Sequence, residues 1–553
     1  ILERTVYMSV RDVEQDSAFQ GIYKYYKKNT SEKSHHIGNL YDQYTIAENR
    51  EKRRIWNKID LAQNELRNLN ADFAFYRWLR PAKRGEDAIE MGLRRYYRIA
   101  HEAALSSDTQ TLLLLRFEII NFIKKIEKRT DIPSTQWHSF LRGFLYLQYV
   151  WEIYAAGQNT ELPDNIENVY LPSLRKLENL SSEQQVLLSG LLSVWKGMCL
   201  LFSKNPDYPT ADNIFESSIK NLKSLYHHPS LWWFARASLV LCYRQRAFMS
   251  KRQGSFDDAN AYYAKAATTN RSLDFNFEEA TIRNDWGDTQ IILGLLNYGH
   301  SNLQDALNLR RKMANGARIA LSYSTLSRYY FARDAFADAR SYAQRGMNIS
   351  PRSTALSKIS LAEAQRRYVS EEFIGPTEEK IALLHSAERE LLDALDGLTE
   401  PVRLIDAKLE LGCLYRDLLR FIESEQAREE FFRKSEGLLT ESAKLASLQN
   451  PPIYWRIADA MANRIWLGLL AQNEDFTRHA TLEFVQLDIF GFDINQKGKF
   501  TEGVRILSSS QKRPLLQFIG KYNVGMRTLL LGKAKKPEQE KMDAIAWHWV
   551  LGL

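Results

Sequence analysis

Histidines come first among the residues that could bind a metal ion or transfer a proton, and their spacing offers no site for either role. The chain has ten of them in 553 residues. Only His35–His36 and His227–His228 are adjacent, and none belongs to a HExxH zinc motif. Adjacent side chains on a helix point about 100° apart, so a shared metal ion is awkward. We therefore expect loop or capping histidines and no bound metal.

Cysteines offer no redox or metal chemistry either. The three of them, Cys199, Cys242 and Cys413, lie far apart, without a disulfide framework or a metal-ligand spacing. Isolated cysteines are typical of small apolar core residues in a reduced, cytosolic protein. The sequence therefore predicts a cytoplasmic protein with no cofactor.

Motifs for nucleotide and ester chemistry are missing as well. A P-loop needs GxxxxGK[ST], because its glycine amides wrap the phosphates and its lysine reaches them. The nearest approach, Gly498-Lys499-Phe500, lacks the upstream glycine and the following Ser or Thr. No GxSxG nucleophile elbow occurs in the chain. We predict that the chain is not an enzyme; a hydrolase with an unrecognised site is the least favoured alternative.

A basic segment near the C-terminus is the least ordinary feature of the sequence. Between residues 497 and 536, ten Lys and Arg accompany one acid, Glu502, while the whole chain carries +8. These cations alternate with aromatic residues such as Phe518 and Tyr522, so they could bind nucleic acid, contact an acidic protein surface or keep the chain soluble. Charge alone selects none of the three. The candidate basic patch comprises Lys512, Arg513, Lys521, Arg527, Lys533, Lys535 and Lys536.

Composition indicates a helical repeat protein. A chain of 553 residues exceeds the roughly 250–300 residues of one compact core, so several domains or a repeat array are expected. Glycine (26) and proline (14) are too scarce for a β-rich fold of this length. No apolar run reaches the ~18–20 residues of a membrane span. The longest candidate, Val186–Phe202, is interrupted by Ser189, Ser193 and Lys196.

A repeated pattern of small and aromatic residues is clearest in Ala317–Pro351. Small residues let two antiparallel helices approach closely, and bulky ones fill the gaps between successive hairpins. One unit earlier, Ala235–Asn270 fits the same frame. A degenerate copy between them contains Ala306, which precedes Ala339 by 33 residues and follows Ala259 by 47, and this predicts an insertion near Ser272–Phe277. The other residues in register are Tyr243, Ala247, Tyr263, Tyr323, Leu326, Tyr330, Ala343, Gly346, Leu411, Gly412 and Tyr415.

These units resemble tetratricopeptide repeats (TPR) over residues 235–470, and more weakly over 60–235. The resemblance implies an all-α fold, an α-solenoid of antiparallel helical hairpins in a TPR-like superhelix, with a small irregular C-terminal segment. An irregular helical bundle is the alternative, but it predicts no recurrence of Ala and Tyr in register. We predict four parts: an N-terminal helical junction (1–60), degenerate hairpins (61–234), the TPR array (235–480) and a basic mixed segment (481–553).

The helices of the first two parts are placed by apolar residues at three- and four-residue spacing. Asp108 is predicted to cap the helix that follows it. The aromatic run Leu231–Phe234 could be an exposed anchor or part of the core between repeats. The expected helices include Gln20–Lys28, Thr45–Asp60, Asn64–Leu79, Glu86–Leu105, Thr109–Lys128 and, later, Tyr454–Ala471.

A second resemblance concerns the N-terminal region. The segments Gly21–Tyr26, Tyr41–Trp56, Ala71–Pro81 and Arg94–Ala103 look like the junction that follows the nucleotide-binding and winged-helix part of bacterial STAND-class NTPases. In that family a helical segment leads into a long TPR array that senses a ligand or partner. The resemblance implies a sensor arm in signal transduction. Because the first residue is Ile1, it also implies an NTPase upstream.

The predicted function is therefore a non-catalytic scaffold that binds a protein or peptide in its concave groove, without membrane insertion and in an unknown oligomeric state. The alternative is nucleic-acid binding through residues 497–536. Five residues at non-core positions of first helices are predicted to face the groove: Arg244, Asn284, Asp288, Arg328 and Arg333.

Overall fold

The computed structural model describes residues 17–483, except for short internal stretches. All regular structure in the described residues is helical, and no strand occurs among them. The basic segment 497–536, with all seven residues of the candidate basic patch, lies outside the described residues. The stretches left out are 48, 79–84, 129–133, 158–159, 204–205, 254, 274, 314, 350–354, 399, 451, 474, 477–478 and 481–482.

The described residues divide into two compact units. The first unit holds those within Ile1–Ala247, Ala261–Ile282 and Asn308–Ala314, and the second holds those within Phe248–Asn260, Arg283–Leu307 and Asn315–Leu553. The boundaries predicted at residues 60, 234 and 480 follow sequence pattern alone and stay predictions.

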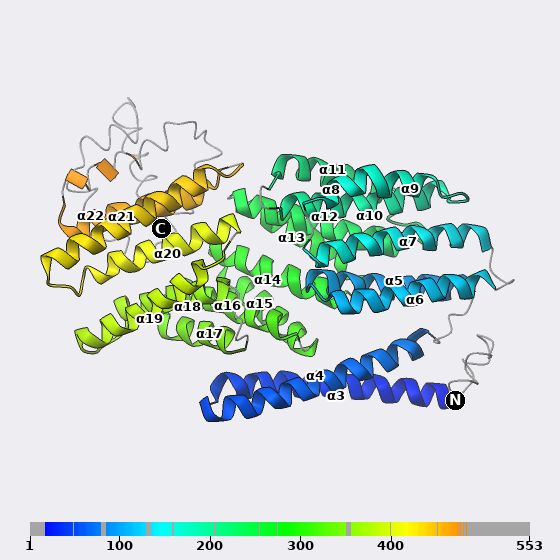
Figure 1. The fold of residues 1–553 in the computed structure, drawn as a ribbon, viewed down its shortest axis with the longest axis horizontal. Helices are drawn as coiled ribbons and strands as arrows, with labels where there is room; N and C mark the ends of the chain where they lie inside the picture. The colour runs from blue at the N-terminus through cyan, green and yellow to red at the C-terminus, as the bar shows by residue number, and fades with distance from the viewer. Residues whose placement is uncertain are drawn as a thin grey trace. The chain divides into compact units, whose positions relative to one another are not determined.

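Antiparallel helical hairpins make up the first unit (Figure 1). Helix α3 pairs with α4, α6 packs on both α5 and α7, and α10 packs on α7 and α11. Between α7 and α10 the chain forms a short π-helical turn, η1, flanked by two one-turn helices. The bounds are α3 Ser17–Ile46, α4 Asn49–Trp78, α5 Gly85–Leu105, α6 Thr109–Glu127, α7 Ser134–Ala155, α8 Leu162–Asn165, η1 Ile166–Tyr170, α9 Leu171–Arg175, α10 Ser182–Leu201 and α11 Tyr208–Lys223.

Most of the helices predicted for this region are confirmed, with one correction. The sequence predicts two helices, Thr45–Asp60 and Asn64–Leu79, but the structure has the single helix α4 over Asn49–Trp78, because no glycine or proline interrupts it. Thr45 and Ile46 are the last residues of α3. Asp108 is the cap of α6, since its Oδ1 accepts a hydrogen bond from the Thr111 amide at 3.1 Å.

Four helices follow whose residues are divided between the two units: α12 Trp232–Gln253, α13 Phe256–Asn270, α14 Asn276–Ile292 and α15 Leu296–Lys312. Trp233 and Phe234 at the start of α12 are 2% and 1% exposed. Within the first unit, the Trp233 indole donates a hydrogen bond to the Leu273 carbonyl at 3.2 Å. The aromatic run is therefore core, as one of the two interpretations predicted.

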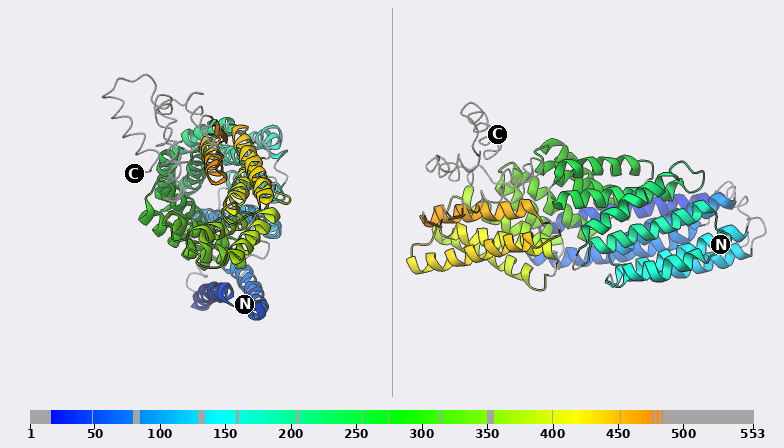
Figure 2. Two further views of the ribbon diagram at one scale, coloured as in Figure 1. Left: turned by 90° about the vertical axis from the view of Figure 1, so that its left-hand side faces the viewer. Right: turned by 90° about the horizontal axis from the view of Figure 1, so that it is seen from above.

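The second unit shows the packing pattern of an α-solenoid. Each helix from α16 to α22 packs on the next, and α16, α18, α20 and α22, the first helices of successive hairpins, also pack on one another. Figure 2 shows α20, α21 and α22, yellow to orange, lying side by side. The bounds are α16 Gly316–Ala332, α17 Phe336–Ile349, α18 Ala355–Glu371, α19 Thr377–Leu395, α20 Pro401–Leu418, α21 Glu425–Ser447 and α22 Tyr454–Ala471.

Small residues set the distance between the two helices of a hairpin. A Cβ atom on Gly287 would lie 2.8 Å from the Gly299 carbonyl oxygen, and one on Gly299 would lie 2.9 Å from the Gly287 oxygen. The equivalent contact one hairpin later is a hydrogen bond of 2.7 Å from the Ser327 hydroxyl to the Ala339 carbonyl. Both pairs bring backbones together where a larger side chain would hold them apart.

These contacts correct the repeat register. Ala259, Gly299 and Ala339 are each the fourth residue of their helices, α13, α15 and α17, and follow one another at intervals of 40 residues. Ala306 is not the counterpart of Ala339, and no insertion is needed to explain its spacing. The period is longer than the 34 residues of the tetratricopeptide motif, because the helices themselves are longer.

Gly287→Ala should therefore destabilise the second unit. The new methyl group meets backbone rather than a movable side chain, so the hairpin must open, at a cost on the order of 1–3 kcal/mol in the free energy of unfolding. Gly437→Ala on α21 is the matched control, because a Cβ there meets nothing within 4 Å. The control should gain about 0.5–1 kcal/mol from helix propensity. Urea titration of both variants measures the difference; equal effects would contradict the close-approach argument.

Candidate functional site

Polar side chains form a stripe on each first helix of the second unit. On α20, Asp406, Glu410 and Asp417 recur at spacings of four and seven residues, which places them on one helix face. Arg456 and Asn463 do the same on α22. Because these helices pack on one another, the stripes form one surface, which we call the polar face. Its other members are Asn284, Asp288, Arg328, Glu363, Arg366 and Asp459.

Two cations compensate the charge of Asp288 on this face. Arg328 Nη1 donates to its two carboxylate oxygens at 3.0 and 3.3 Å, and Lys251 pairs with the same carboxylate. Burial opposes the ionisation of Asp288, but the combined positive charges of Lys251 and Arg328 outweigh it and hold the pKa well below its usual value. Asp288 is therefore a stable anion that orients Arg328.

Asp417 is held in the same way by two guanidinium groups. Arg366 Nη1 donates to its Oδ2 at 2.6 Å, and Arg416 donates to its Oδ1 from Nε at 2.9 Å and Nη2 at 2.7 Å. Burial raises the pKa of Asp417, but the charges of Arg416 and Arg366 reverse the shift and leave it far below the usual value. Arg366 also pairs with Glu410 through Nε, so one guanidinium bridges two acids of α20.

Arg456 joins two further acids at the C-terminal end of the face. Its Nη2 lies 2.6 Å from Asp406 Oδ1, and its Nη1 lies 3.2 Å from Asp459 Oδ2. Asn463 Nδ2 donates to Asp459 Oδ1 at 3.0 Å. Burial is the largest influence on Asp459; although Arg456 opposes it, the pKa rises to about 6, with Glu410 adding to the rise. Arg456 is shared between the two acids, so its charge offsets the burial of Asp459 only in part.

Glu363 on α18 is the uncompensated acid. Among the described residues, no hydrogen bond or ion pair reaches its carboxylate. Burial and then the nearby negative charge of Glu410 raise its pKa to about 7, against the weaker opposing charges of Arg328, Arg366 and Arg456. Each of these arginines is already paired with another acid, so its positive charge acts on Glu363 only at longer range.

A cavity of about 50 Å³ opens between these side chains, and we call it the Glu363 cavity. Residues from α16, α18, α20 and α22 line it, so four consecutive first helices contribute to its walls. The lining combines charged groups with an apolar floor: Arg328, Phe331, Ile359, Glu363, Arg366, Asp406, Leu409, Glu410, Cys413, Arg456, Asp459 and Asn463.

The five residues predicted to face the groove do not all meet. Asp288 and Arg328 do, and Asn284 lies on the same helix as Asp288, where its amide donates to Thr325 Oγ1 at 3.3 Å. Arg333 instead caps the end of α16 and donates to the Tyr329 hydroxyl at 3.1 Å. Arg244 belongs to the first unit.

There, Arg244 forms an ion pair of 2.8 Å with Glu278, which also contacts His101 Nε2 at 2.5 Å. His101 and Glu278 are fully buried, and the rings of Trp195 and Phe275 enclose the histidine. His101 is thus a core residue, unlike the loop or capping histidines expected from the sequence. This pair has no opening to solvent that would admit a ligand, so we assign it to the core.

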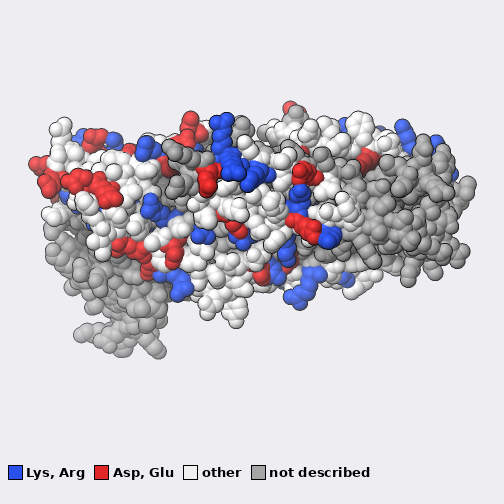
Figure 3. Space-filling view, turned by 90° about the horizontal axis from the view of Figure 1, so that it is seen from below, with Lys and Arg blue, Asp and Glu red and all other residues white. Residues whose placement is uncertain are grey.

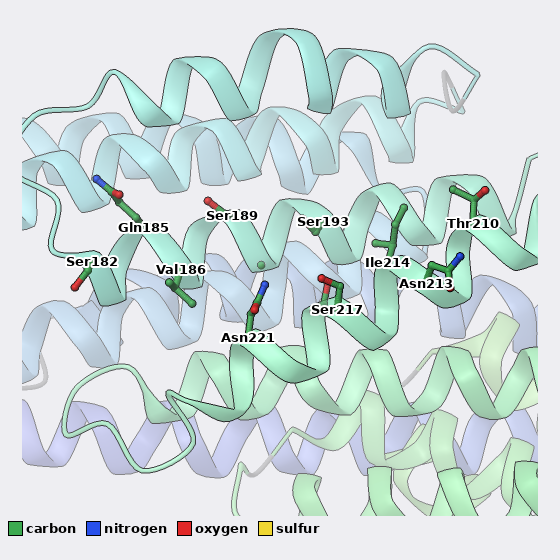
Figure 4. Close-up of a pocket in the computed structure, with 12 residues that line it drawn as sticks. Ser182, Gln185, Val186, Ser189, Ser193, Thr210, Asn213, Ile214, Ser217 and Asn221 are labelled. Atoms are coloured by element: carbon green, nitrogen blue, oxygen red, sulfur yellow. The ribbon is translucent and has the colours of Figure 1, made fainter.

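A larger and chemically different cavity lies between α10 and α11 of the first unit. Its volume is about 600 Å³, and no charged side chain lines it. In Figure 4, two rows of small polar residues, including Ser189 and Ser193 on α10 and Ser217 and Asn221 on α11, run along the two helices. The lining offers neutral hydroxyl and amide groups and contains no titratable side chain.

On the face that Figure 3 draws, acidic and basic side chains are interspersed, and neither sign covers a continuous area. Within the described ranges, no three His, Cys, Asp or Glu side chains converge to hold a metal ion. No helix in those ranges is long and apolar enough to cross a bilayer.

Burial raises the pKa of the Cys199 and Cys413 thiols to about 12, which disfavours thiolate chemistry at both.

Comparisons with known proteins give only a distant likeness. No family model matches the chain, and no curated protein sequence matches it. Among solved structures, the human IFIT1 dimer with PPP-AAAA is 10% identical, with a TM-score of 0.40 over 84% of this chain and 88% of that one. A monomeric IFIT1 mutant with Gppp-AAAA is 11% identical, with a TM-score of 0.42 over 85% and 88%. Likeness at this level says nothing of what this chain binds.

The acids that sequence reasoning missed were detectable in part. The run of polar residues at helical spacing on α20 and α22 was visible, but the TPR pattern drew attention to Leu411, Gly412 and Tyr415 instead. Arg328, Arg366 and Arg456 come from three different hairpins. Residue spacing within a single helix therefore could not predict that they lie close together.

The raised pKa of Glu363 predicts a pH-dependent stability. With a pKa of about 7 in the folded chain and an ordinary value of 4.5, the native state binds more protons than the unfolded state between these pH values. The free energy of unfolding should therefore fall as the pH rises through this window. Glu363→Gln should remove this contribution and stabilise the protein above pH 7 by about 1–3 kcal/mol.

Urea denaturation at pH 5 and pH 8 measures the effect. The matched control is Glu423→Gln, since Glu423 is exposed and lies outside the cavity; it should leave the pH profile unchanged. A destabilising effect of Glu363→Gln at pH 8 would show that the carboxylate is compensated after all.

Proposed function

We propose that this chain is a non-catalytic α-solenoid scaffold that binds a protein or peptide partner on the polar face of the second unit. The observation that supports this is the amount of buried charge there. Arg366 and Asp417 are 3% and 1% exposed in their side chains, and Arg416 is fully buried. Replacing buried ion pairs by apolar residues of similar volume is often neutral or stabilising. Buried ion pairs therefore add little to stability, and the simplest explanation for so many on the polar face is that they bind a partner.

The position of the face on the first helices favours a polypeptide ligand. First helices of stacked hairpins line the inner surface of such arrays, which binds an extended peptide, a helix or a domain. Positive and negative groups are interspersed along the face, with Arg328, Arg366 and Arg456 set among six acids. An interspersed pattern selects partners of complementary charge order and rejects others by repulsion, so it gives specificity more than affinity.

A finer proposal concerns the larger protein. The N-terminal segments that resemble the junction of bacterial STAND-class NTPases suggest that the scaffold is the sensor arm of a signalling protein. Partner binding on the polar face would then regulate a linked NTPase. Detection of a P-loop upstream in the gene would support this proposal, and an unrelated upstream sequence would remove it.

The second candidate function is nucleic-acid binding through residues 497–536. It is supported by the ten Lys and Arg of that segment alone. Binding that depends on phosphate contacts should fall steeply with added salt. Retention of the chain on single-stranded RNA or DNA between 50 and about 200 mM salt tests it, with a chain ending at residue 496 as the comparison.

The test of the main proposal is the combination Asn284→Ala with Arg328→Ala. Wild-type chain is used to select binders from a displayed library of random peptides. The double variant should lose at least about 10-fold in affinity for the selected peptides, because it removes one amide and one cation from the face. The fold should persist, since Lys251 still compensates Asp288.

The matched control is Arg433→Ala on α21, whose side chain is 75% exposed and pairs only with Glu429. The control should bind the selected peptides as the wild type does. Peptides that bind the double variant and the wild type equally would place the binding surface elsewhere.

A further inference from the structure

From the one uncompensated carboxylate of a cavity shared by four helices, we infer that the Glu363 cavity receives a single primary ammonium group, the end of a lysine side chain of the partner. The inference deepens the proposed function and rests on it, because it assigns one position of the partner to one site on the polar face. Three properties of the cavity support it: its charge balance, its volume and its apolar walls.

Charge comes first. The cavity lining contains four carboxylates, Glu363, Asp406, Glu410 and Asp459, against three guanidinium groups. The guanidinium groups are occupied. Arg328 pairs with Asp288, Arg366 with Glu410 and Asp417, and Arg456 with Asp406 and Asp459. The site thus lacks one positive charge, and the acid without a partner is Glu363.

Size decides between cations. A volume of about 50 Å³ holds a few water molecules or one group of comparable size. An ammonium group is a compact point charge with three donors, whereas a guanidinium group is a planar fork that needs bidentate acceptors. A metal ion is a poor occupant, since in the described part of the chain no group of carboxylates converges to ligate one. The ammonium group fits best.

The walls suit the aliphatic part of a lysine. Phe331, Ile359, Leu409 and Cys413 supply apolar surface beside the charged groups. A lysine side chain buries its methylene stem against such surface while its charged end reaches polar atoms. The cavity therefore offers separate partners to the two parts of one side chain.

Occupancy should depend on pH because the cation binds the ionised form of Glu363. The titratable and charged groups that face it are Arg328 from α16, Arg366 from α18, Asp406, Glu410 and Cys413 from α20, and Arg456 and Asp459 from α22. Asp459 titrates in the same range as Glu363, with a pKa of about 6 against about 7. Binding should tighten as the pH rises from 6 to 8, and each bound ammonium should displace a proton from the fraction of Glu363 that is protonated.

The experiment uses the whole chain and n-butylammonium chloride, a probe with the ammonium group and stem of a lysine. Isothermal titration at pH 8 should show binding to the wild type, at least about 10-fold weaker binding to Glu363→Gln, and weaker binding of the wild type at pH 6. The variant is expected to be stable, so a loss of binding is not a loss of folding. Glu423→Gln should bind the probe as the wild type does.

Three comparison ligands make the result specific. n-Butanol has the stem without the charge, tetramethylammonium has a charge too bulky for the cavity, and sodium chloride has a small cation without a stem. None should bind as n-butylammonium does. Equal binding by any of them, or by the Glu363→Gln variant, would overturn the assignment.

A covalent readout locates the bound amine. Carbodiimide coupling in the presence of dansylcadaverine joins an amine to an activated carboxyl as an amide, with the water taken up as the urea by-product. Peptide mapping should find Glu363 labelled ahead of the exposed Glu423, and labelling at Glu363 should fall when n-butylammonium competes. Labelling that is uniform over surface carboxyls would refute the site. If n-butylammonium binds as described but the selected peptides do not bind the polar face, the ammonium site stands and the scaffold proposal falls. If the peptides bind the polar face but n-butylammonium does not bind, the scaffold proposal stands and the ammonium site falls.

Discussion

Each helical hairpin of this chain leaves an apolar stripe uncovered until the next hairpin packs on it, and everything else in the structure depends on that requirement. It explains why α16, α18, α20 and α22 pack successively on one another. It also explains the glycines at 287 and 299, since close packing of two helices requires side chains that keep their backbones near each other. Stacking then brings the polar stripes of separate hairpins together in the polar face.

The polar face adds a cost to that stacking. Ionisable groups lose their hydration when the first helices pack, and only mutual compensation makes the burial tolerable. Asp288 and Asp417 achieve it, because each lies between two cations. Glu363 does not. A protein selected for stability alone would carry glutamine or an apolar residue there, and such unfavourable positions are where function and stability are in conflict.

The sequence predicts features that depend on residues close together in the chain. It does not predict those that depend on contacts between distant helices. Asp108 could be recognised as a cap, because its partner, the Thr111 amide, lies three residues away. Trp233 could be recognised as a core residue from its aromatic type alone, although its partner Leu273 lies 40 residues away. The pairing of Arg328 with Asp288 was anticipated only as a shared face. Glu363 was missed, because its environment is set by α20 and α22, and their register depends on hairpins longer than the 34-residue motif suggests.

The composite wall of the Glu363 cavity limits how this array can evolve. Repeat proteins commonly change length by gaining or losing whole units, since each unit contacts only its neighbours. Here α16, α18, α20 and α22 each contribute to the same 50 Å³. Duplication or deletion of a hairpin between Gly316 and Ala471 would separate the arginines from their acids, so this stretch is bound to be inherited as a block, and length variation among descendants should be confined to the flanks.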